Sequence, residues 1–202
     1  EVVMINFIEN NESEPYVEFR NLYQKALNKG QEHIEAVCIS SYDPKINEVQ
    51  SRFVNLKYIK NEEWIFFSNY DSPKALSFKL HDQITSTFFW NSTYTQVRIK
   101  AKIYKTDKKF SDMHFNNRSV EKNALAISST QSKKISSYEE VIKNYDETLK
   151  NFSSDTERPI YWGGFSFRPF YFEFWHGNNK RLNKRTVYEQ NKNLWVKYYL
   201  QP

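Results

Sequence analysis

Large aromatic side chains are abundant in this chain, and glycine is scarce. Phe, Tyr and Trp make up 17% of the 202 residues, whereas only four glycines are present. Aromatic residues bury large areas and favour strands. With so few glycines the chain cannot form a glycine-rich phosphate loop, so side chains or ordinary backbone amides must hold any phosphate. A closed barrel suits this combination, because its strands bury large side chains inside and pair their edges.

Short apolar runs bounded by turn residues predict a series of antiparallel strands. Turn chemistry at Asp43-Pro44-Lys45 and Asn191-Lys192-Asn193 separates two of the strand pairs. The expected strands cover residues 34–42, 50–59, 64–67, 84–90, 94–104, 165–175, 184–189 and 194–200.

Helical spacing of apolar residues occurs in three places. Residues 16–27 form an amphipathic pattern that stops before Gly30, and Pro73 suits the first turn of a short helix ending near Leu80. Residues 107–150 are rich in Ser and Lys and carry one apolar stripe, made of Tyr138, Val141, Ile142, Tyr145 and Leu149. We therefore expect a mainly β protein with peripheral helices (α+β), in which residues 1–15 form an N-terminal arm and residues 16–202 a single domain.

The charge and the cysteine content limit the choice of function. The formal net charge is +5, but Lys alternates with Asp and Glu along most of the chain, which is typical of a solvated surface. Nucleic-acid binding therefore remains only a remote alternative. Cys38 is the single cysteine, lies in an apolar run and is expected in the core, so no internal disulfide can form. No segment is apolar enough to span a membrane and no signal peptide is recognised, so we expect a cytoplasmic protein.

Several common catalytic sites are excluded by the motifs that the chain lacks. The four histidines (His33, His81, His114 and His176) are scattered and do not have metal-ligand spacing, so no metal site is expected. The sequence contains neither a Gly-x-Ser-x-Gly elbow nor a Gly-x-Gly-x-x-Gly fingerprint. Nucleophilic hydrolysis and nicotinamide binding on a Rossmann unit therefore lose support.

Basic residues on or beside the expected strands are the remaining candidates for binding. Arg52 and Lys57 are five residues apart, which places them on opposite faces of a strand unless a bulge intervenes. Such a strand could serve two anionic groups on its two sides. Arg98, Arg181 and Arg185 also accompany strands. Taken singly, each of these side chains is more often a surface charge.

Taken together, the basic residues fall within six motifs whose order and spacing resemble the pyridoxamine 5′-phosphate oxidase family. The likeness covers nearly the whole chain after about residue 15, and Trp195 to Pro202 also fits it. The motifs are RFVNLK at 52–57, FFSNYDSPK at 66–74, FFW at 88–90 with QVR at 96–98, QS at 131–132, WGGF at 162–165, and EFW at 173–175 with RLNKR at 181–185. The chain is identified as a divergent member of this family.

The resemblance implies an FMN-binding split β-barrel that forms a homodimer, with FMN in the groove between the subunits. Arg52 and Lys74 would hold the FMN phosphate, with Ser132 nearby, because guanidinium and ammonium groups bind phosphate through several donors. Trp175 and Arg185 would come from the partner side of the groove. The complete set of implied cofactor-binding residues is Arg52, Phe53, Val54, Lys57, Phe67, Ser68, Lys74, Gln96, Gln131, Ser132, Trp175 and Arg185.

The same resemblance implies oxidation of pyridoxamine or pyridoxine 5′-phosphate to pyridoxal 5′-phosphate, with hydride passed to the flavin and then to O₂. Lys57, His114, Arg118 and Lys122 match the positions that bind the substrate phosphate. Arg181 and Asn183 match substrate-binding and catalytic positions at the flavin face. A simpler alternative for Arg118 and Lys122 is a solvated helix face, because they are four residues apart.

Departures from the family pattern leave the substrate open. Pro73 stands where the family usually has Arg, Phe67 where it has Tyr, and Asn55 where it has an apolar residue. His114 and Lys122 replace Tyr and Ser, and Asn183 replaces a His. One interpretation is a working oxidase with a divergent pocket. The other is an FMN-binding paralogue that acts on another anionic small molecule, or binds its ligand without efficient turnover.

Overall fold

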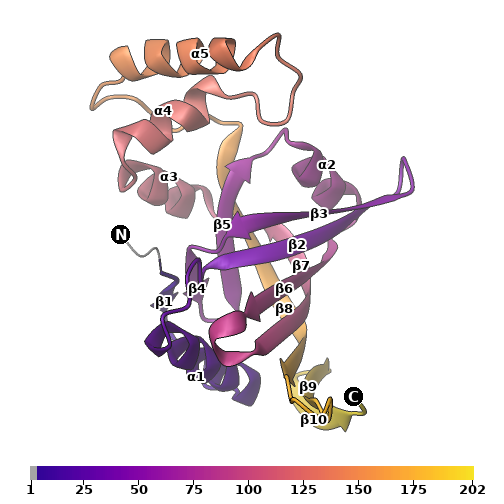
Figure 1. Cartoon of the computed structure of the whole chain (residues 1–202). Coiled ribbons are helices and arrows are strands. Elements are labelled where there is room, and N and C mark those ends of the chain that lie inside the picture. Colours follow the sequence, from indigo (N-terminus) through magenta and orange to yellow (C-terminus); the bar gives the residue numbers. More distant parts are fainter. Residues whose placement is uncertain (1–3) are drawn as a thin grey trace.

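A computed structural model describes residues 4–202, which contain ten strands, five α-helices and one short 3₁₀ helix (Figure 1). The elements are β1 (Asn6–Ile8), α1 (Glu14–Asn28), β2 (Ala36–Asp43), β3 (Glu48–Asn55), β4 (Tyr58–Lys60), β5 (Glu63–Asn69), α2 (Pro73–Leu80), β6 (Gln83–Trp90), η1 (Asn91–Thr93), β7 (Thr95–Lys105), α3 (Lys108–Asn116), α4 (Val120–Ser128), α5 (Tyr138–Lys150), β8 (Trp162–His176), β9 (Lys184–Asn191) and β10 (Leu194–Leu200). No helix among them has the length and apolar character needed to cross a membrane.

The strands form one sheet in the order β1-β4-β5-β8-β7-β6-β2-β3, and β9 and β10 extend it from β8. The long strand β8 pairs with β5 through residues 162–167 and with β9 through residues 171–176, while β7 runs along both halves. All pairings among the described strands are antiparallel except that of β1 with β4. The expected antiparallel, mainly β arrangement with peripheral helices is therefore confirmed.

A register shift in the middle of β8 explains how this strand serves two parts of the sheet. Lys100 pairs with Tyr171, whereas the next residue, Ala101, pairs with Pro169, so Phe170 is an extra residue on β8. Proline cannot donate a ladder hydrogen bond, and a bulge bends its strand and increases the local twist. The bulge therefore lies between the half of β8 that pairs with β5 and the half that pairs with β9.

The core is built from the aromatic residues that dominate the sequence. The ring of Phe19 on α1 packs against Trp64 of β5 and Phe88 of β6, with ring centroids 4.5 Å and 5.4 Å apart. Trp64, Phe88 and Trp90 are almost completely buried. Tilted and edge-to-face aromatic pairs of this kind add to the free energy gained by burial. Helix α1 therefore covers one side of the barrel, and these aromatic contacts hold the helix against the sheet.

Two details at the start of the chain differ from the sequence prediction. Residues 6–8, expected within an arm, form β1 and pair with β4; residues 1–3 of that arm lie outside the described residues. The division of the chain into an arm and a single domain stays a prediction. Cys38 was expected in the core, but it is half-buried on the face of β2 opposite to Val37 and Ile39, which are fully buried. The alternation of side chains along β2, and not the apolar residues next to Cys38 in the sequence, therefore decides which face Cys38 occupies.

The segment 107–150, expected to be helical, forms α3, α4 and α5 at one end of the molecule, opposite to β9 and β10 (Figure 1). Asp107, Ser119 and Ser137 cap the three helices by accepting hydrogen bonds from backbone N–H groups. None of the α5 side chains is fully buried, and Tyr138 and Ile142 of the expected stripe are exposed. Helix α3 packs against β8, which brings helical side chains next to the barrel.

Candidate active site

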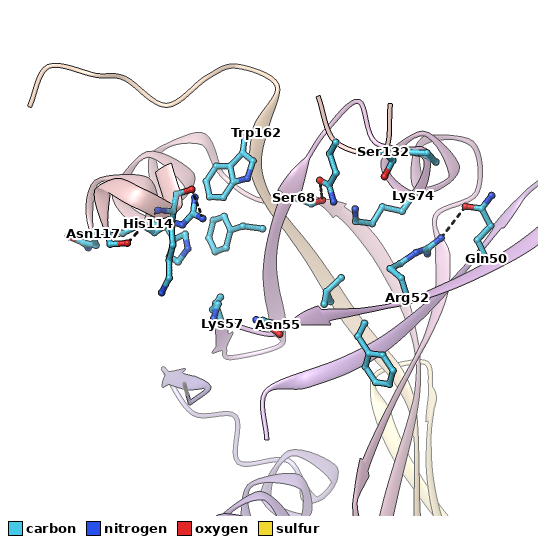
Figure 2. Close-up of a pocket in the computed structure, with 18 residues that line it drawn as sticks. Gln50, Arg52, Asn55, Lys57, Ser68, Lys74, His114, Asn117, Ser132 and Trp162 are labelled. Atoms are coloured by element: carbon cyan, nitrogen blue, oxygen red, sulfur yellow. Dashed lines mark hydrogen bonds between the residues drawn. The ribbon is translucent and has the colours of Figure 1, made fainter. Parts of the chain in front are cut away.

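A cavity of about 1030 Å³ lies beside β3 and β5, and α2, α3 and α4 contribute to its wall (Figure 2). Its size is at the upper end of the range typical of ligand pockets. Eighteen residues line it, and none of them is acidic. Five of the lining residues are cationic, namely Arg52, Lys57, Lys74, Arg118 and Lys122. Since no lining carboxylate neutralises these groups, the cavity is suited to an anionic ligand.

Arg52 and Lys57 both line this cavity, so the prediction that they lie on opposite faces of one strand is wrong. The expected strand 50–59 is broken, because β3 ends at Asn55 and β4 begins at Tyr58. Between them, Leu56 is fully buried, and the Lys57 N–H donates to the Ile65 carbonyl at 2.9 Å. This break redirects the chain from pairing with β2 to pairing with β5 and leaves Lys57 at the cavity wall.

One end of the cavity is formed by Arg52 and Lys74. The Arg52 guanidinium donates to Ser41 Oγ at 2.9 Å and to Gln50 Oε1 at 3.2 Å, which fixes its orientation. Lys74 is on the first turn of α2 and is 7% exposed. Burial, together with the charge of Arg52, lowers the pKa of the Lys74 ammonium to about 8. Two nearby cations without an acidic partner form a suitable site for a phosphate group.

Polar groups lie next to this cationic end. Gln131 Oε1 accepts from Ser68 Oγ at 3.0 Å and from the Asn69 N–H at 3.1 Å, so its amide nitrogen remains available to donate to a ligand. Ser132 lines the cavity with a left-handed backbone, at φ 66°. In Figure 2, Ser132 and Lys74 lie on the same side of the cavity as Arg52. The predicted residues Phe53, Val54 and Phe67 also line the cavity.

The other end of the cavity holds Lys57, Arg118, Lys122 and His114, and Figure 2 shows Lys57 and His114 on the opposite side from Lys74. Burial lowers the pKa of Lys57, an effect that Glu35 opposes and that Lys122 and Arg118 reinforce. Burial also lowers the pKa of Arg118 to about 10, so this side chain is still charged at neutral pH. The cavity therefore contains two separate groups of cations.

Arg118 is held in place by three neighbours. Its guanidinium carbon lies 4.4 Å from the ring centroid of Trp162, and its nitrogens donate to Asn123 Oδ1 at 3.2 Å and to the Lys122 carbonyl at 3.1 Å. Arg118 precedes the N-cap residue of α4, Ser119. The alternative in which Arg118 and Lys122 form a solvated helix face is therefore wrong, because Arg118 is outside the helix and half-buried.

His114 occupies a buried position between aromatic rings. Its Nδ1 lies 2.8 Å from the Tyr58 hydroxyl, and its ring stacks on Phe67 with centroids 3.6 Å apart and planes 12° apart. Sequence reasoning did not find Tyr58, Trp162 or Asn123 as parts of this site. Trp162 belongs to one of the motifs that we quoted, and Tyr58 directly follows Lys57, but only the fold shows that they contact His114 and Arg118.

Three predicted residues lie outside this cavity and form a row of their own. Gln96 on β7 pairs with Trp175 on β8, which in turn pairs with Arg185 on β9. Directly paired residues share one face of a sheet. Arg185 is oriented by the buried Glu173, to which its Nε donates at 2.8 Å. Within one chain, the two cationic groups therefore line the same cavity, whereas the row of Gln96, Trp175 and Arg185 does not.

Arg181 and Asn183 lie in the loop between β8 and β9 and do not line the cavity either. Arg181 has a left-handed backbone, at φ 59°, and its N–H donates to the Asn178 carbonyl. Asn183 Oδ1 accepts from the Asn178 N–H at 3.0 Å. The side chain of Asn183 thus stabilises this loop, and its amide nitrogen is left without a partner among residues 4–202.

Comparison with known proteins shows which family the chain belongs to. Residues 162–202 match the family model described as the pyridoxine 5′-phosphate oxidase C-terminal dimerisation region. A pyridoxine/pyridoxamine 5′-phosphate oxidase from Cytophaga hutchinsonii is 34% identical over 177 residues, which cover 87% of this chain and 82% of that protein. The enzyme of the same name from Rhodopirellula baltica is 30% identical, over 94% of this chain and 88% of that protein. The chain belongs to this oxidase family.

Solved structures support the same fold. The chain superposes on PhzG from Burkholderia lata 383, determined in complex with tetrahydrophenazine-1-carboxylic acid, with a TM-score of 0.88 and 23% identity over 94% of this chain and 93% of that one. A pyridoxamine 5′-phosphate oxidase-related, FMN-binding protein from Nostoc punctiforme gives a TM-score of 0.74 and 12% identity, over 91% and 97% of the two chains. These structures confirm the predicted split-barrel fold, and the two oxidases above confirm the prediction of an oxidoreductase of the pyridoxamine 5′-phosphate oxidase type.

Proposed function

We propose that this family member holds FMN in the cavity and oxidises pyridoxamine or pyridoxine 5′-phosphate to pyridoxal 5′-phosphate. The observation that carries the proposal is the presence of two separate cationic groups in one cavity without a lining carboxylate. A site for a phosphorylated cofactor beside a phosphorylated substrate needs such a pair of anion-binding ends. When bound, FMN would supply the hydride acceptor, and O₂ would then reoxidise it.

The residues at the Arg52 end fit the phosphate of FMN. Arg52, Lys74 and Ser132 all carry donors, and no acidic residue of the cavity competes for them. The amide nitrogen of Gln131 lies next to these groups and would donate to the polar ribityl chain or the flavin edge, whereas Ser68 Oγ, which already donates to Gln131, would accept from a ribityl hydroxyl. Pro73, at the position of the family's Arg, removes one further donor, so fewer groups share the phosphate.

The residues at the Lys57 end fit the phosphate of the substrate. Lys57, Arg118 and Lys122 supply positive charge, and His114 adds a further nitrogen. Arg118 keeps part of its donor fork free, since Nη1 and Nη2 donate one hydrogen bond each within residues 4–202. Charge-assisted hydrogen bonds to phosphate are stronger than those between neutral groups. This end would therefore favour the phosphorylated form of a vitamin B6 compound.

A second copy of the chain would complete the site. Gln96, Trp175 and Arg185 lie outside the cavity of their own chain, and two of them belong to the segment that matches the dimerisation region. In a homodimer, this row and the loop with Arg181 and Asn183 would approach the partner's cavity. Arg181 and Asn183 would then contact the substrate on the flavin face, which is the catalytic role that we assign to them.

A second candidate is a paralogue that binds FMN but acts on another anionic small molecule, or turns over poorly. The observation that favours it is the changed set of side chains around the substrate, in which His114 is buried against Phe67 and Asn183 binds its own loop. Asn183 cannot take up a proton near neutral pH, whereas a histidine can. The cationic end remains, so an anionic substrate is common to both candidates.

A spectroscopic titration distinguishes these candidates. The purified protein should show the visible absorbance of bound flavin, and anaerobic addition of pyridoxamine 5′-phosphate should bleach it. Pyridoxal 5′-phosphate should form in this anaerobic step, as water replaces the amino group and ammonia leaves, and admission of O₂ should then restore the absorbance and yield H₂O₂. Bound flavin that pyridoxamine and pyridoxine 5′-phosphate both fail to bleach would favour the paralogue. If the protein neither contains flavin nor binds added FMN, the proposal fails, and the remote alternative of a nucleic-acid-binding barrel regains interest.

A further inference from the structure

The contact between Tyr58 and His114 joins two elements that are far apart in the sequence. Tyr58 begins β4 and His114 lies near the end of α3, yet the Tyr58 hydroxyl is 2.8 Å from His114 Nδ1. The tyrosine ring also packs edge-on against His114 and against Phe110, with centroids 5.4 Å and 5.1 Å apart. Both partners are thus fixed by packing as well as by the hydrogen bond.

His114 is uncharged in this environment. The residue is 8% exposed, and its ring stacks on Phe67, which in turn stacks on Trp162. Burial, followed by the positive charges of Arg118, Lys57 and Lys122, lowers the pKa of the imidazole to about 3. A neutral imidazole carries one proton, on either Nδ1 or Nε2, so its partner decides which nitrogen can donate.

The position of the proton follows from the hydrogen bonds of Tyr58. Burial raises the pKa of Tyr58, so the phenol stays protonated near neutral pH. Among residues 4–202, His114 Nδ1 is the only hydrogen-bond partner of the Tyr58 hydroxyl. If Nδ1 carried the imidazole proton, the phenolic proton would lack an acceptor, which costs free energy in a half-buried place. The favoured arrangement therefore has Tyr58 donating to Nδ1 and the proton of His114 on Nε2.

The remaining nitrogen is available to a ligand. His114 lines the cavity, and Nε2 has no hydrogen-bond partner among the described residues. We propose that Tyr58 is a positioning residue that holds His114 as the neutral Nε2–H tautomer, so that His114 donates a hydrogen bond from an uncharged N–H group to an anionic oxygen of the substrate beside Lys57, Arg118 and Lys122. The identity of that anion as a phosphate ester rests on the proposed function.

This arrangement assigns a different task to each group. The three cations attract the anion and neutralise its charge, whereas a single N–H group on a stacked, buried ring fixes where one oxygen lies. The donor strength of His114 does not depend on protonation, because the ring stays neutral across the physiological range of pH. Tyr58 is therefore a specificity-determining residue outside the set of residues that touch the ligand.

The tautomer can be measured directly on the protein as purified, without substrate. In ¹⁵N-histidine NMR spectra at pH 7, the His114 signal, assigned by its loss in His114→Gln, should show an unprotonated Nδ1 and a protonated Nε2. Tyr58→Phe should remove this preference, and the matched variant Tyr104→Phe, whose hydroxyl bonds Glu63 on another part of the surface, should not. A protonated Nδ1, an imidazolium at pH 7, or an unchanged tautomer in Tyr58→Phe would overturn the proposal.

Ligand binding then tests what the tautomer is for, with pyridoxal 5′-phosphate and unphosphorylated pyridoxal as probes. Tyr58→Phe should weaken binding of pyridoxal 5′-phosphate by about three- to tenfold, the loss expected for one neutral hydrogen bond, and should leave binding of pyridoxal unchanged. In a His114→Gln background, Tyr58→Phe should have no further effect. Unchanged affinity in Tyr58→Phe would overturn the role in binding. Lack of binding to the unaltered protein would contradict the proposed function, while the NMR result would still test the role of Tyr58.

Discussion

Lys74 and Arg52 lie close enough at one end of the cavity that the charge of Arg52 helps to lower the pKa of Lys74. Burial is the larger cause, and the resulting pKa is about 8. The ammonium is therefore mostly charged near pH 7, is half deprotonated near pH 8 and has lost most of its charge by about pH 9. An anion bound between the two cations would favour the charged form, so proton binding and anion binding are linked.

The first prediction concerns the pH dependence of FMN affinity. FMN affinity should be constant below about pH 7.5 and fall above pH 8, by at most about tenfold per pH unit, because binding requires one proton on Lys74. Isothermal titration or flavin fluorescence between pH 6.5 and pH 9.5 measures this. The variant Lys74→Arg should bind FMN with little dependence on pH in this range, because Arg keeps its charge. A profile for the unaltered protein as flat as that of Lys74→Arg would contradict the prediction.

The stability of the FMN-free protein should change in the opposite direction. The pKa of Lys74 is lowered from its unfolded value of 10.5 to about 8 in the folded chain. Between these values the unfolded chain binds more protons than the folded chain, so the contribution of Lys74 to stability should increase as the pH rises from 8 to 10.5. Urea unfolding of the protein and of Lys74→Met over this range isolates the effect. Equal pH dependence of the two proteins would show that the Lys74 pKa is not lowered.

A further prediction concerns the contribution of each cation at this end. Arg52→Ala or Lys74→Ala should weaken FMN binding about ten- to a hundredfold, since a hydrogen bond to a charged group contributes about 1.5–3 kcal/mol. With Pro73 at the place of the family's Arg, few other donors can compensate. Lys79→Ala provides a matched control, because Lys79 is exposed on the same helix, α2. If FMN affinity is the same in all three variants, the phosphate lies elsewhere.

Much of the fold was predictable, because strand patterns and helix caps are local signals. The break at Leu56 and Lys57 was not, because residues 50–59 read as one continuous strand. Strand β3 ends because of tertiary contacts: Leu56 is fully buried, and the Lys57 N–H donates to the Ile65 carbonyl on β5. Strand β1 was missed for a related reason, since three residues form a strand only when β4 provides a partner.

The candidate site shows the same division between local and tertiary information. The cations were identified from the resemblance, three of them within the quoted motifs and Arg118 and Lys122 at matching positions, and the fold brings all five to one cavity. The supporting residues were not identified, because nothing in the sequence connects Tyr58 with His114 or Trp162 with Arg118. Trp175 and Arg185 were expected to come from the partner side, but Gln96 was not grouped with them; the strand pairing puts all three in one row outside the cavity of their own chain.

The separation of this row from the cavity makes the dimer testable by complementation. We expect a species with twice the 24.4 kDa chain mass in light scattering. Arg52→Ala/Lys74→Ala in one chain and Arg185→Ala in the other should each reduce FMN binding as homodimers. Coexpressed, they should form heterodimers in which one site is intact, which restores about a quarter of all sites if the chains pair at random. No recovery in a purified heterodimer would show that each site is built within one chain.

At the substrate end, loss of Arg118 should lower the activity on phosphorylated substrates much more than the activity on unphosphorylated ones. Arg118→Ala should lower kcat/KM for pyridoxamine 5′-phosphate by at least ~10-fold, because a charge-assisted contact contributes about 1.5–3 kcal/mol. It should barely change any weak activity on pyridoxamine itself. Arg168→Ala, which removes an exposed arginine near Glu62 and Glu63, is the control. An equal loss for both compounds would show that Arg118 does not bind the substrate phosphate, and the assignment to a vitamin B6 phosphate would fail in favour of the paralogue.

Asn183→His tests whether the loop that we assign to the flavin face still serves a vitamin B6 phosphate. Asn183 Oδ1 now accepts a hydrogen bond from the Asn178 N–H. A histidine could accept the same bond through Nδ1 and still direct Nε2 towards the substrate, where it could take up a proton near neutral pH. The variant should therefore bleach the flavin faster with pyridoxamine 5′-phosphate in anaerobic stopped-flow measurements. Asn183→Gln, which keeps the amide, should give no such gain. If flavin content is normal and Asn183→His is no faster, the B6-phosphate assignment loses support, and the paralogue that acts on another anionic compound becomes the better explanation.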